Sequence, residues 1–405
     1  MGIAPSLHFV VPVWGEGYVQ TYLDYCLPAQ LSPGNIPALG IGRGHRYTIY
    51  TTRSDYERMA GAQSYRALQQ MIAVTVEFLD ATLSVKPDAQ AVDKYRVKSE
   101  CYRHSLKRAS EDGEAVFALN ADIVLANGFV RTAVDLLANG KRVIEVPGPR
   151  GLRDPIARTL ISHHRASDGA SISIEPTELS ALWMRNMHPQ LKMHFVEGPK
   201  GAPFHPSHLY WAVGEEGVII RGFHLYPILI NPTDCAVEFN TTIDDDLVGN
   251  LGVTPDEVFL AQDSRDIFCC ELSPPDHYVG PMASRGDLNR YVDFYLSYAR
   301  RNIWNLEHEI IVSGVRDLSP QWDIRRRQSA RFTGKLLKRY HAESRRRASP
   351  TLYMRMTGTF LPRLHRTRDV AVRAIRPMLP RPLVGALRRV RAAFSKSLRS
   401  RNRPP

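Results

Sequence analysis

The stretch 115–124 (AVFALNADIV) ends an apolar run on Asn120 and Asp122, and Asn127-Gly128 and a helical pattern follow. In an α/β domain, polar side chains at the carboxyl end of a buried strand lie in the crevice where such sheets bind ligands. Carboxylate oxygens there can hold a hard divalent cation, which neutralises charge on a departing diphosphate. Asp122 is the residue that we expect to supply such a carboxylate oxygen. A capping or turn role for Asp122 is the alternative.

The loop after the first apolar run is a second candidate for ligand binding. The run ends in Val11-Pro-Val-Trp-Gly15, and a helical pattern begins at Glu16. A strand that runs directly into a short loop and a helix leaves backbone N–H groups facing the crevice, where they suit a nucleotide. An ordinary strand-to-helix turn with Trp14 as a packing residue is the alternative.

Alternating apolar runs and helical patterns in the first half indicate an α/β fold. Strands are predicted at 7–13, 47–51, 72–79, 115–124 and 142–146, with helices at 22–31, 55–70, 93–109 and 128–139. This rhythm is typical of a mostly parallel sheet flanked by helices. Beyond Pro147 we expect short strands, including a hairpin formed by 211–213 and 218–226, and one amphipathic helix over 288–298.

Three of these segments resemble the first, second and fourth strands of a GT-A nucleotide-sugar glycosyltransferase: 7–15 (LHFVVPVWG), 47–51 (YTIYT) and 117–124 (FALNADIV). The resemblance covers about 7–150 and extends more loosely to about 280. It implies a GT-A-like sheet and a nucleotide-diphospho-sugar donor bound across the first strands. The family's Asp-x-Asp motif falls on Asn120 and Asp122, so its first carboxylate is absent here.

The resemblance also implies a set of donor-binding residues along the crevice. A helix opening at Asp93 would run near the donor, where Lys94, Arg96 or Lys98 could pair with a phosphate; Lys98 is our choice. The alternative is a solvated helical surface. The predicted donor-binding residues are Pro12, Val13, Trp14, Thr52, Lys98, Asn120 and Asp122.

The same resemblance implies a general base C-terminal to the Asn120-x-Asp122 position. Inverting transfer needs a carboxylate within hydrogen-bond reach of the acceptor hydroxyl. Asp244, within 241–246 (TTIDDD), and Asp263, which follows the apolar run 258–260, are the predicted catalytic residues. For the three aspartates at 244–246, an exposed helix start is the alternative.

A metal ion on the donor diphosphate would take its ligands from both halves of the chain. Asp122 and His224 are the predicted metal ligands for Mn²⁺ or Mg²⁺, because a neutral imidazole ligates such ions and also donates to phosphate. His205 and His208 are weaker candidates that suit a loop. The missing first carboxylate at Asn120 puts the need for a divalent cation in question.

The charge of the chain is strongly asymmetric. Residues 321–405 hold 24 of the 53 Lys and Arg residues and three acids, which leaves 29 basic and 38 acidic residues in 1–320. We predict a catalytic domain over 1–320, with a nucleotide-sugar-binding half at 1–150 and an acceptor-side half at 151–320. A basic amphipathic helical tail over 321–405 follows, with an apolar helical face at 383–398 suited to an anionic membrane surface.

Composition limits the other classes. The chain has five cysteines without CxxC spacing, no secretory signal pattern and no apolar run long enough to cross a membrane. We therefore expect a cytoplasmic location, peripheral on the inner face of the plasma membrane.

The predicted function is transfer of a sugar, hexosyl or related, from a nucleotide-diphospho-sugar to a hydroxyl acceptor. A glycan or lipid-linked intermediate of cell-surface polysaccharide biosynthesis is the expected acceptor. Two alternatives stay open: a nucleic-acid-binding protein that acts through its basic tail, and a catalytically inactive GT-A-like scaffold. A nucleotidyltransferase is a lesser rival, because the loop 11–17 lacks a basic residue. Nucleic acid is not expected as a partner, because the tail lacks interleaved aromatic residues and the body is acidic.

Overall fold

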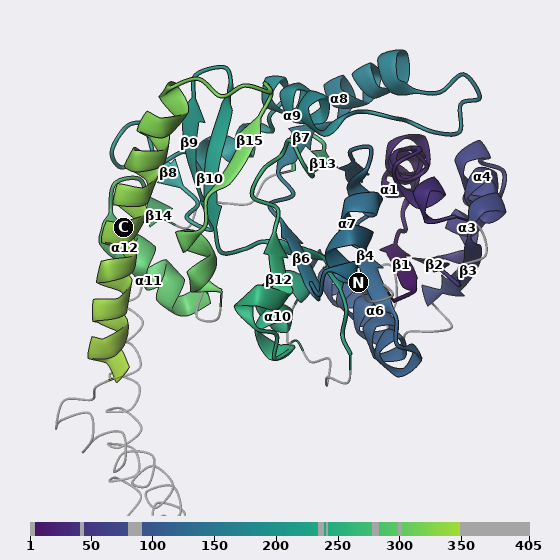
Figure 1. Cartoon of the computed structure of the whole chain (residues 1–405), viewed down its shortest axis with the longest axis horizontal. Coiled ribbons are helices and arrows are strands. Elements are labelled where there is room, and N and C mark those ends of the chain that lie inside the picture. Colours follow the sequence, from purple (N-terminus) through teal and green to yellow (C-terminus); the bar gives the residue numbers. More distant parts are fainter. Residues whose placement is uncertain are drawn as a thin grey trace, which may run out of the picture. The chain divides into compact units, whose positions relative to one another are not determined.

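The computed structural model describes residues 5–40, 44–79, 91–233, 239, 242–277, 283–298 and 302–348. The described residues up to Tyr340 pack as one unit, and the chain from His341 onward lies outside that unit. In the first unit, a largely parallel central sheet is flanked by helices (Figure 1). This mixed α/β architecture is compatible with the GT-A-like fold that the sequence resemblance implies.

The central sheet has seven strands in the order β12-β6-β11-β4-β1-β2-β3. Their bounds are β1 Leu7–Pro12, β2 Arg46–Thr51, β3 Ala73–Phe78, β4 Ala115–Ala118, β6 Val143–Val146, β11 Tyr226–Ile230 and β12 Val258–Leu260. β11 is antiparallel to both of its neighbours, β4 and β6, and the other neighbouring pairs are parallel. The carboxyl ends of β1, β2 and β4 therefore meet at one edge, the edge at which open α/β sheets bind ligands.

The helices of the first half confirm the predicted rhythm with one break. They are α1 Glu16–Thr21, a π-helical turn Tyr22–Cys26, α2 Leu27–Gln30, the 3₁₀ turn Ile36–Leu39, α3 Arg53–Ala60, α4 Gln63–Met71, α6 Ala91–Asp112 and α7 Phe129–Ala138. The single helix predicted over 55–70 is wrong, because α3 ends at Ala60 and Gly61 forms its C-cap.

The single strand predicted over 115–124 is also wrong. β4 ends at Ala118, and β5 (Ile123–Leu125) begins a second sheet, in which it pairs with β13 (Cys269–Ser273). β13 pairs in turn with β7 (Arg150–Leu152). Periodicity alone does not reveal this break, because both strands are buried and apolar.

The predicted hairpin is confirmed, but its second strand is shorter than expected. β9 (His208–Val213) pairs antiparallel with β10 (Gly217–Gly222), and β15 (Ile310–Ser313) adds a third strand. The chain then leaves this sheet, and β11 enters the central one. The remaining elements are α8 Arg153–Thr159, the π-helical turn Leu160–His164, α9 Pro176–Arg185, the 3₁₀ turn Pro189–Met193, β8 Pro203–Phe204, the π-helical turn Ile243–Leu247, α10 Val248–Asn250, the 3₁₀ turn Pro255–Glu257, β14 Ala283–Ser284, α11 Leu288–Tyr298, the 3₁₀ turn Ile303–Glu307 and α12 Gln321–Ala348.

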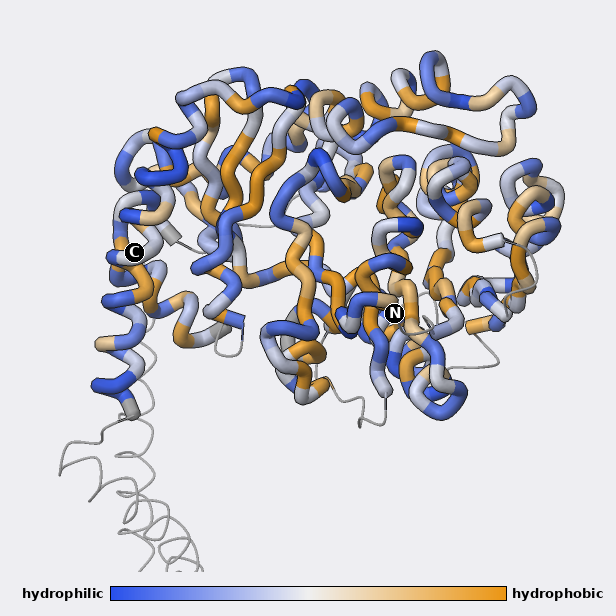
Figure 2. The backbone as a smooth tube through the Cα atoms, viewed as in Figure 1, coloured by the Kyte–Doolittle hydropathy of each residue, from blue (hydrophilic) through white to orange (hydrophobic). Residues whose placement is uncertain are grey.

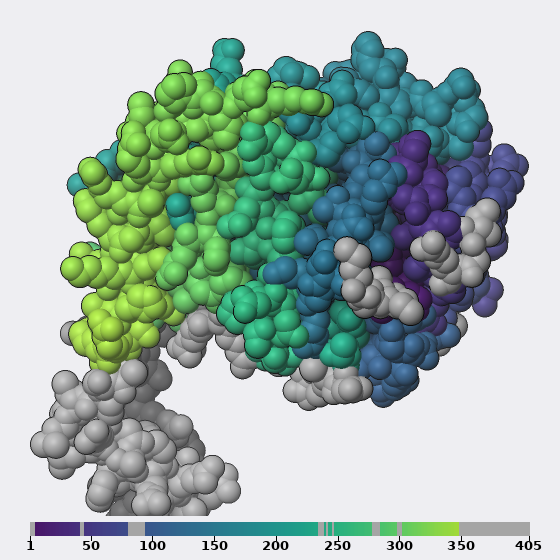
Figure 3. Space-filling model, viewed as in Figure 1, coloured from purple at the N-terminus to yellow at the C-terminus, as the bar shows by residue number. Residues whose placement is uncertain are grey.

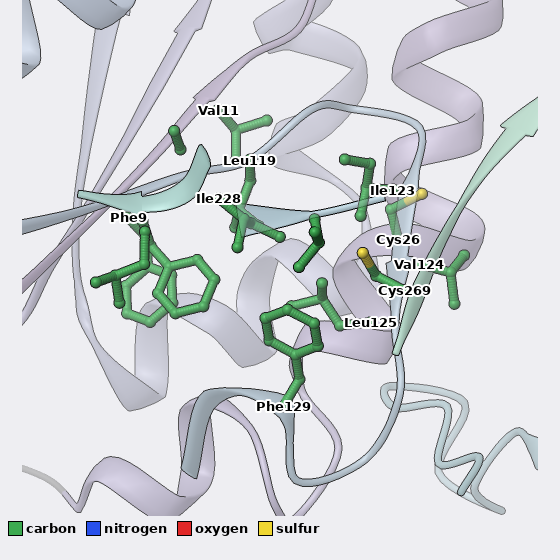
Figure 4. Close-up of a cluster of buried hydrophobic side chains, with 14 of the residues drawn as sticks. Phe9, Val11, Cys26, Leu119, Ile123, Val124, Leu125, Phe129, Ile228 and Cys269 are labelled. Carbon is green, nitrogen blue, oxygen red and sulfur yellow. The ribbon is translucent and has the colours of Figure 1, made fainter. Parts of the chain in front are cut away.

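Two clusters of buried side chains hold the first unit together. The larger follows the central sheet, where the Phe9 ring stacks between Tyr47 and Phe117 with centroids 5.7 and 5.1 Å away. Figure 4 shows the part of it around Phe9, Leu119 and Phe129. Figure 2 shows the hydrophobic residues concentrated in the strands and the hydrophilic ones on outer turns.

The second cluster lies between the β9-β10-β15 sheet and helices α11 and α12. Trp211 packs edge-on against Phe332 of α12, and Trp322, Leu336 and Tyr340 are buried. Figure 3 shows the yellow-green residues of α12 against the green and teal segments of this region. The boundary predicted at residue 320 thus falls before a helix whose apolar side packs on the body up to Tyr340.

The rest of the predicted tail, including the apolar helical face at 383–398, lies outside the described residues. Among the described helices, none combines the length and the apolar character needed to span a bilayer. Four cysteines, Cys26, Cys101, Cys269 and Cys270, are free and buried.

Candidate active site

The candidate site is built around the turn that links β4 to β5. Leu119 still follows the sheet, since its N–H donates to the carbonyl of Val10 at 2.9 Å. The chain then turns at 120–122, where the Ile123 N–H donates to the Asn120 carbonyl at 3.3 Å. Asn120 and Asp122 therefore lie where the chain passes from the central sheet to the second sheet.

Asn120 is fixed by two tyrosines from other elements. Its Oδ1 atom lies 3.0 Å from the hydroxyl of Tyr102, on α6, and 3.0 Å from that of Tyr226, at the start of β11. The two hydroxyls are 3.0 Å apart, and that of Tyr102 also lies 2.8 Å from the Leu119 carbonyl. The carboxamide oxygen of Asn120 is therefore occupied as a hydrogen-bond acceptor.

Asp122 faces a second carboxylate that the sequence analysis did not identify. Burial raises the pKa of Asp122 to about 7, and the Glu271 carboxylate of β13 adds to the increase while Lys98 and Arg150 oppose it. Glu271 is itself bound by Arg150, whose Nε lies 2.8 Å from Oε1, and by the Ser273 hydroxyl at 2.8 Å. A glutamate between Cys270 and Leu272, in a short strand of mostly apolar residues, was the one available signal.

Lys98 lies on the α6 side of the site. Its Nζ atom is 5.9 Å from the ring centre of Tyr102 and 5.7 Å from that of Tyr226, within the range of cation–π attraction. Its positive charge lowers the pKa of both Asp122 and Asp244. The ammonium forms no ion pair or hydrogen bond with any described residue. The other two basic candidates, Lys94 and Arg96, are exposed on the same helix.

The His224 imidazole and the Asp244 carboxylate form a close pair on the other side of the site. The His224 Nε2 and Asp244 Oδ2 atoms are 3.0 Å apart. Burial alone would raise the pKa of Asp244, but His224, the Thr242 hydroxyl and Lys98 together hold it well below its ordinary value. Asp244 is therefore ionised, and the Asn120 tyrosines lie near it, since its charge raises the pKa of Tyr102 and Tyr226.

Further histidines pack behind His224. The ring of His194 lies 5.3 Å from that of His205 and 5.5 Å from that of His208. Burial lowers the pKa of His194 to about 3 and that of His205 to about 4, with the neighbouring histidines adding to both decreases. The Ser207 hydroxyl lies 2.8 Å from His205 Nδ1 and 3.2 Å from His208 Nδ1. These rings are neutral packing groups at neutral pH.

Asp263 is placed differently from Asp244. Both of its carboxylate oxygens are bound by the guanidinium of Arg265, with Nε 2.9 Å from Oδ1, and the Arg265 backbone N–H donates to Oδ1 at 3.0 Å. This carboxylate closes the turn after β12. Of the two predicted bases, Asp244 is the one that the structure brings together with Lys98 and Asp122.

The predicted donor loop is held by a residue that the sequence analysis did not single out. Asp55 accepts a hydrogen bond from the Gly15 N–H at 2.9 Å, and Gly15 adopts a φ of 83°. Thr52 is the N-cap of α3. Its hydroxyl oxygen accepts a hydrogen bond from the Asp55 N–H at 3.2 Å and donates one to Asp55 Oδ2 at 2.8 Å. Thr52 thus supports the loop that follows Pro12 and Val13, both buried, and Trp14, which packs partly against the core.

Two exposed tyrosines lie on the side of the site formed by Asp122 and Glu271. Tyr18 on α1 is 45% exposed and Tyr95 on α6 is 53% exposed. Partial burial raises the pKa of Tyr18, and the charges of Asp122 and Glu271 and the phenol of Tyr95 add to the increase. Both phenols therefore lie within electrostatic range of the site.

The described residues form no divalent cation site from side chains alone. No group of three or more His, Cys, Asp or Glu side chains within them is arranged to hold a metal ion. Of the two predicted ligands, His224 pairs with Asp244, which leaves Asp122 beside an arginine-bound Glu271. An Mn²⁺ or Mg²⁺ ion bound by Asp122 and His224 stays a prediction.

No protein-family model matches the chain, and no curated protein matches its sequence. Among solved structures, the apo form of mouse xyloside xylosyltransferase 1 is similar over 39% of this chain and 59% of that chain, with 8% identity and a TM-score of 0.24. A Bacillus anthracis protein assigned as a glucose-1-phosphate thymidylyltransferase, in complex with sucrose, is similar over 44% of this chain and 83% of that chain, with 11% identity and a TM-score of 0.22. The aligned region thus spans less than two thirds of the xylosyltransferase, and function is argued below from the site itself.

Proposed function

We propose that this protein is a GT-A-like glycosyltransferase, which moves a sugar from a nucleotide-diphospho-sugar to a hydroxyl acceptor. The observation that supports it most is the position of Lys98. Its ammonium acts on Asp122 on one side and on the Asp244–His224 pair on the other, at the carboxyl edge of the parallel strands. A donor diphosphate and an acceptor hydroxyl need such an arrangement, a cation next to a proton acceptor.

On the donor side, the exposed phenols of Tyr18 and Tyr95 suit a nucleobase. Stacking of a base on an aromatic ring contributes about 1–3 kcal/mol and tolerates any base. The diphosphate would then lie near Lys98, with the backbone N–H of Trp14 as a further donor, because the Val13 and Gly15 N–H groups donate to Tyr50 and Asp55. Arg150 is less available, because Glu271 binds its guanidinium.

On the acceptor side, the His224–Asp244 pair takes the proton. An ionised Asp244 with a lowered pKa is a weak base alone, but it orients the imidazole and stabilises an imidazolium. The acceptor oxygen forms a bond to the anomeric carbon as its proton passes to the pair. The bond from that carbon to the diphosphate oxygen breaks, and the nucleoside diphosphate leaves with the electron pair.

The acceptor is proposed to be a glycan or lipid-linked intermediate at an anionic membrane surface. Helix α12 supports this with a row of cations at one-turn spacing, Arg327, Arg331, Lys335, Lys338 and Arg339, which we call the α12 stripe. All five are exposed, and none forms an ion pair within the described residues. The row is about 18 Å long at 1.5 Å per residue.

The packing of α12 changes how such contact would occur. Its main apolar residues, Trp322, Leu336, Leu337 and Tyr340, are buried in the second cluster. Ile324 is exposed but stands alone, so this part of the helix has no continuous apolar face to insert into lipid. Contact through the α12 stripe is therefore electrostatic. Each cation near an anionic leaflet contributes about 1 kcal/mol, and salt screens the attraction.

A thermal-shift and direct-binding screen against UDP-, GDP-, CMP- and dTDP-sugars tests the donor assignment. We expect one nucleotide class to bind the wild type, and Tyr18→Ala or Tyr95→Ala to weaken it about tenfold through lost stacking. Ile324→Ala, which truncates an exposed apolar side chain on α12, is the matched control and should have no effect. If no nucleotide binds the wild type, with or without Mn²⁺, the proposed function is wrong.

A further inference from the structure

The side-chain oxygen of Asn120 stands where a metal ion would need a carboxylate ligand. An Asp-x-Asp motif offers carboxylate oxygens to a hard cation. Here the only oxygen on the Asn120 side chain lies 3.0 Å from two tyrosine hydroxyls, those of Tyr102 and Tyr226. Each hydroxyl carries one proton, and that of Tyr102 also lies 2.8 Å from the Leu119 carbonyl, so the Asn120 oxygen accepts one or two hydrogen bonds from these tyrosines.

The other oxygen and nitrogen atoms near Asp122 that could bind a metal ion already have partners in the protein. Glu271 Oε1 takes hydrogen bonds from Arg150 and Ser273, and His224 Nε2 faces Asp244 at 3.0 Å. Within the described part of the chain, each carboxylate or imidazole next to Asp122 thus has a cationic or acidic partner of its own. Asp122 is then the one carboxylate of the motif that remains to a divalent cation, whose other ligands would have to be phosphate oxygens and water.

Lys98 carries the positive charge of the site that no acidic side chain among the described residues neutralises by contact. Arg150 is neutralised by Glu271, and His224 is paired with Asp244. Lys98 has no such partner among the described residues. Its charge acts on both Asp122 and Asp244, and the rings of Tyr102 and Tyr226 flank its ammonium at 5.9 and 5.7 Å.

We propose that the Lys98 ammonium takes the place of a metal ion, and that this site binds the diphosphate of its donor without a divalent cation. A lysine is a compact point charge with three donors, which suits phosphate oxygens. The tyrosine rings hold the ammonium between the two acidic groups, and Tyr102 and Tyr226 also fix Asn120. One pair of tyrosines thus both occupies the oxygen of the motif and positions the replacement cation.

This inference rests on the proposed function, and inorganic pyrophosphate separates the two. We would measure pyrophosphate binding to the full chain by calorimetry, first in buffer with EDTA and then in buffer with Mn²⁺ and no EDTA. Wild type should bind in EDTA, with less than a twofold change on adding Mn²⁺. Lys98→Met should lose at least tenfold in affinity and Lys98→Arg should retain most of it. Lys107→Met, an exposed lysine nine residues along α6, should match the wild type.

The outcomes divide as follows. Pyrophosphate binding that needs Mn²⁺, or that Lys98→Met leaves unchanged, overturns the role given to Lys98. If nucleotide-sugars bind only with Mn²⁺, the proposed function stands and the metal-free site is wrong. If pyrophosphate binds through Lys98 but no nucleotide-sugar binds, the anion site stands and the proposed function is wrong. Circular dichroism of Lys98→Met, compared with Lys98→Arg, shows whether a loss of affinity comes from misfolding.

Discussion

The carboxamide oxygen of Asn120 lies 3.0 Å from the phenol oxygen of Tyr226, a residue 106 positions further along the chain. This contact joins the carboxyl end of β4 to the beginning of β11, the antiparallel strand beside it. Asn120 is therefore a junction of the fold as well as a neighbour of Asp122. The asparagine that weakens the metal motif has a structural function of its own.

Asn120→Asp should create a response to metal that the wild type lacks. An aspartate keeps one oxygen for the two tyrosine hydroxyls and adds a second oxygen where the amide nitrogen stands. Together with Asp122, it would offer two carboxylates to a hard cation. We expect Mn²⁺ to raise nucleoside diphosphate affinity at least fivefold in this variant, measured by calorimetry against EDTA. Asn289→Asp, with the same charge change on exposed α11, should show no response; the same lack of response in Asn120→Asp would contradict the prediction.

Asp244→Asn should weaken His224 as the proton acceptor while leaving the donor bound. The amide cannot stabilise a positive charge on His224, so the transfer rate should fall about 10²–10⁴-fold, the usual contribution of general-base catalysis. The affinity for the nucleotide should change less than threefold, because Asp244 lies on the acceptor side.

Asp263→Asn is the matched comparison, since Asp263 is the other predicted base. Its carboxylate binds Arg265, so the variant should lose stability and keep its rate per folded molecule. Rates are compared after correcting for the folded fraction. An equal fall of the rate in both variants would argue against the Asp244 assignment.

Glu145→Gln should stabilise the protein at alkaline pH. Glu145 is 1% exposed on β6, and burial raises its pKa from 4.5 to about 7, although a hydrogen bond from Asn305 Nδ2 at 3.2 Å opposes the increase. The folded state thus binds this proton more tightly than the unfolded state. The free energy of unfolding should therefore fall as the pH rises from about 4.5 to about 7, by roughly 3 kcal/mol in total.

Glutamine has the shape of the protonated acid and can donate to Asn305 Oδ1, which has no hydrogen-bond partner among the described residues. Urea unfolding at pH 5 and pH 8 should show little gain for Glu145→Gln at pH 5 and a clear gain at pH 8. Glu57→Gln on exposed α3 should leave the pH dependence unchanged. A gain of equal size at both pH values would show that the charge of Glu145 is not its cause.

Reversing charge on the α12 stripe should weaken binding to anionic vesicles. The triple variant Arg331→Glu, Lys335→Glu, Lys338→Glu should bind vesicles containing phosphatidylglycerol at least tenfold more weakly than the wild type at low salt. Neither protein should bind neutral phosphatidylcholine vesicles. A control with the same charge change on three other exposed helical residues, Arg66→Glu, Lys107→Glu and Arg185→Glu, should lose less affinity. Equal losses in the two triple variants would mean that net charge, and not the α12 stripe, determines binding.

Local patterns predicted much of the fold because each depends on neighbouring residues. The runs that became β1, β2, β3 and β6 and the helices α6 and α7 have their own periodicity. The break between β4 and β5 was missed because Ile123 and Val124 continue an apolar run, and only pairing with β13 draws them into another sheet. The break at Gly61 was missed because the polar pattern of the two helices runs through it.

The candidate site was predicted where its residues follow strands and missed where they meet across the chain. Asp122 was identifiable from its position at the end of a predicted strand. Lys98 was one of three basic residues on a predicted helix that the family resemblance places near the donor. Glu271 was not, because its proximity to Asp122 depends on β13 returning to pair with β5 after more than a hundred residues. The clamp of Asp263 by Arg265 is local, but no pattern distinguishes it from an open carboxylate.

The place of β11 determines when the sheet can be completed during synthesis. β4 and β6 are formed from residues 115–118 and 143–146, yet their facing edges bond only to β11, residues 226–230. A nascent chain that has reached residue 150 therefore carries two strands with unpaired backbone groups next to the gap, and burying such groups is costly. The sheet closes only after about eighty more residues have left the ribosome. The first 150 residues expressed alone should accordingly aggregate or remain unfolded, and co-expression with the remainder should rescue them.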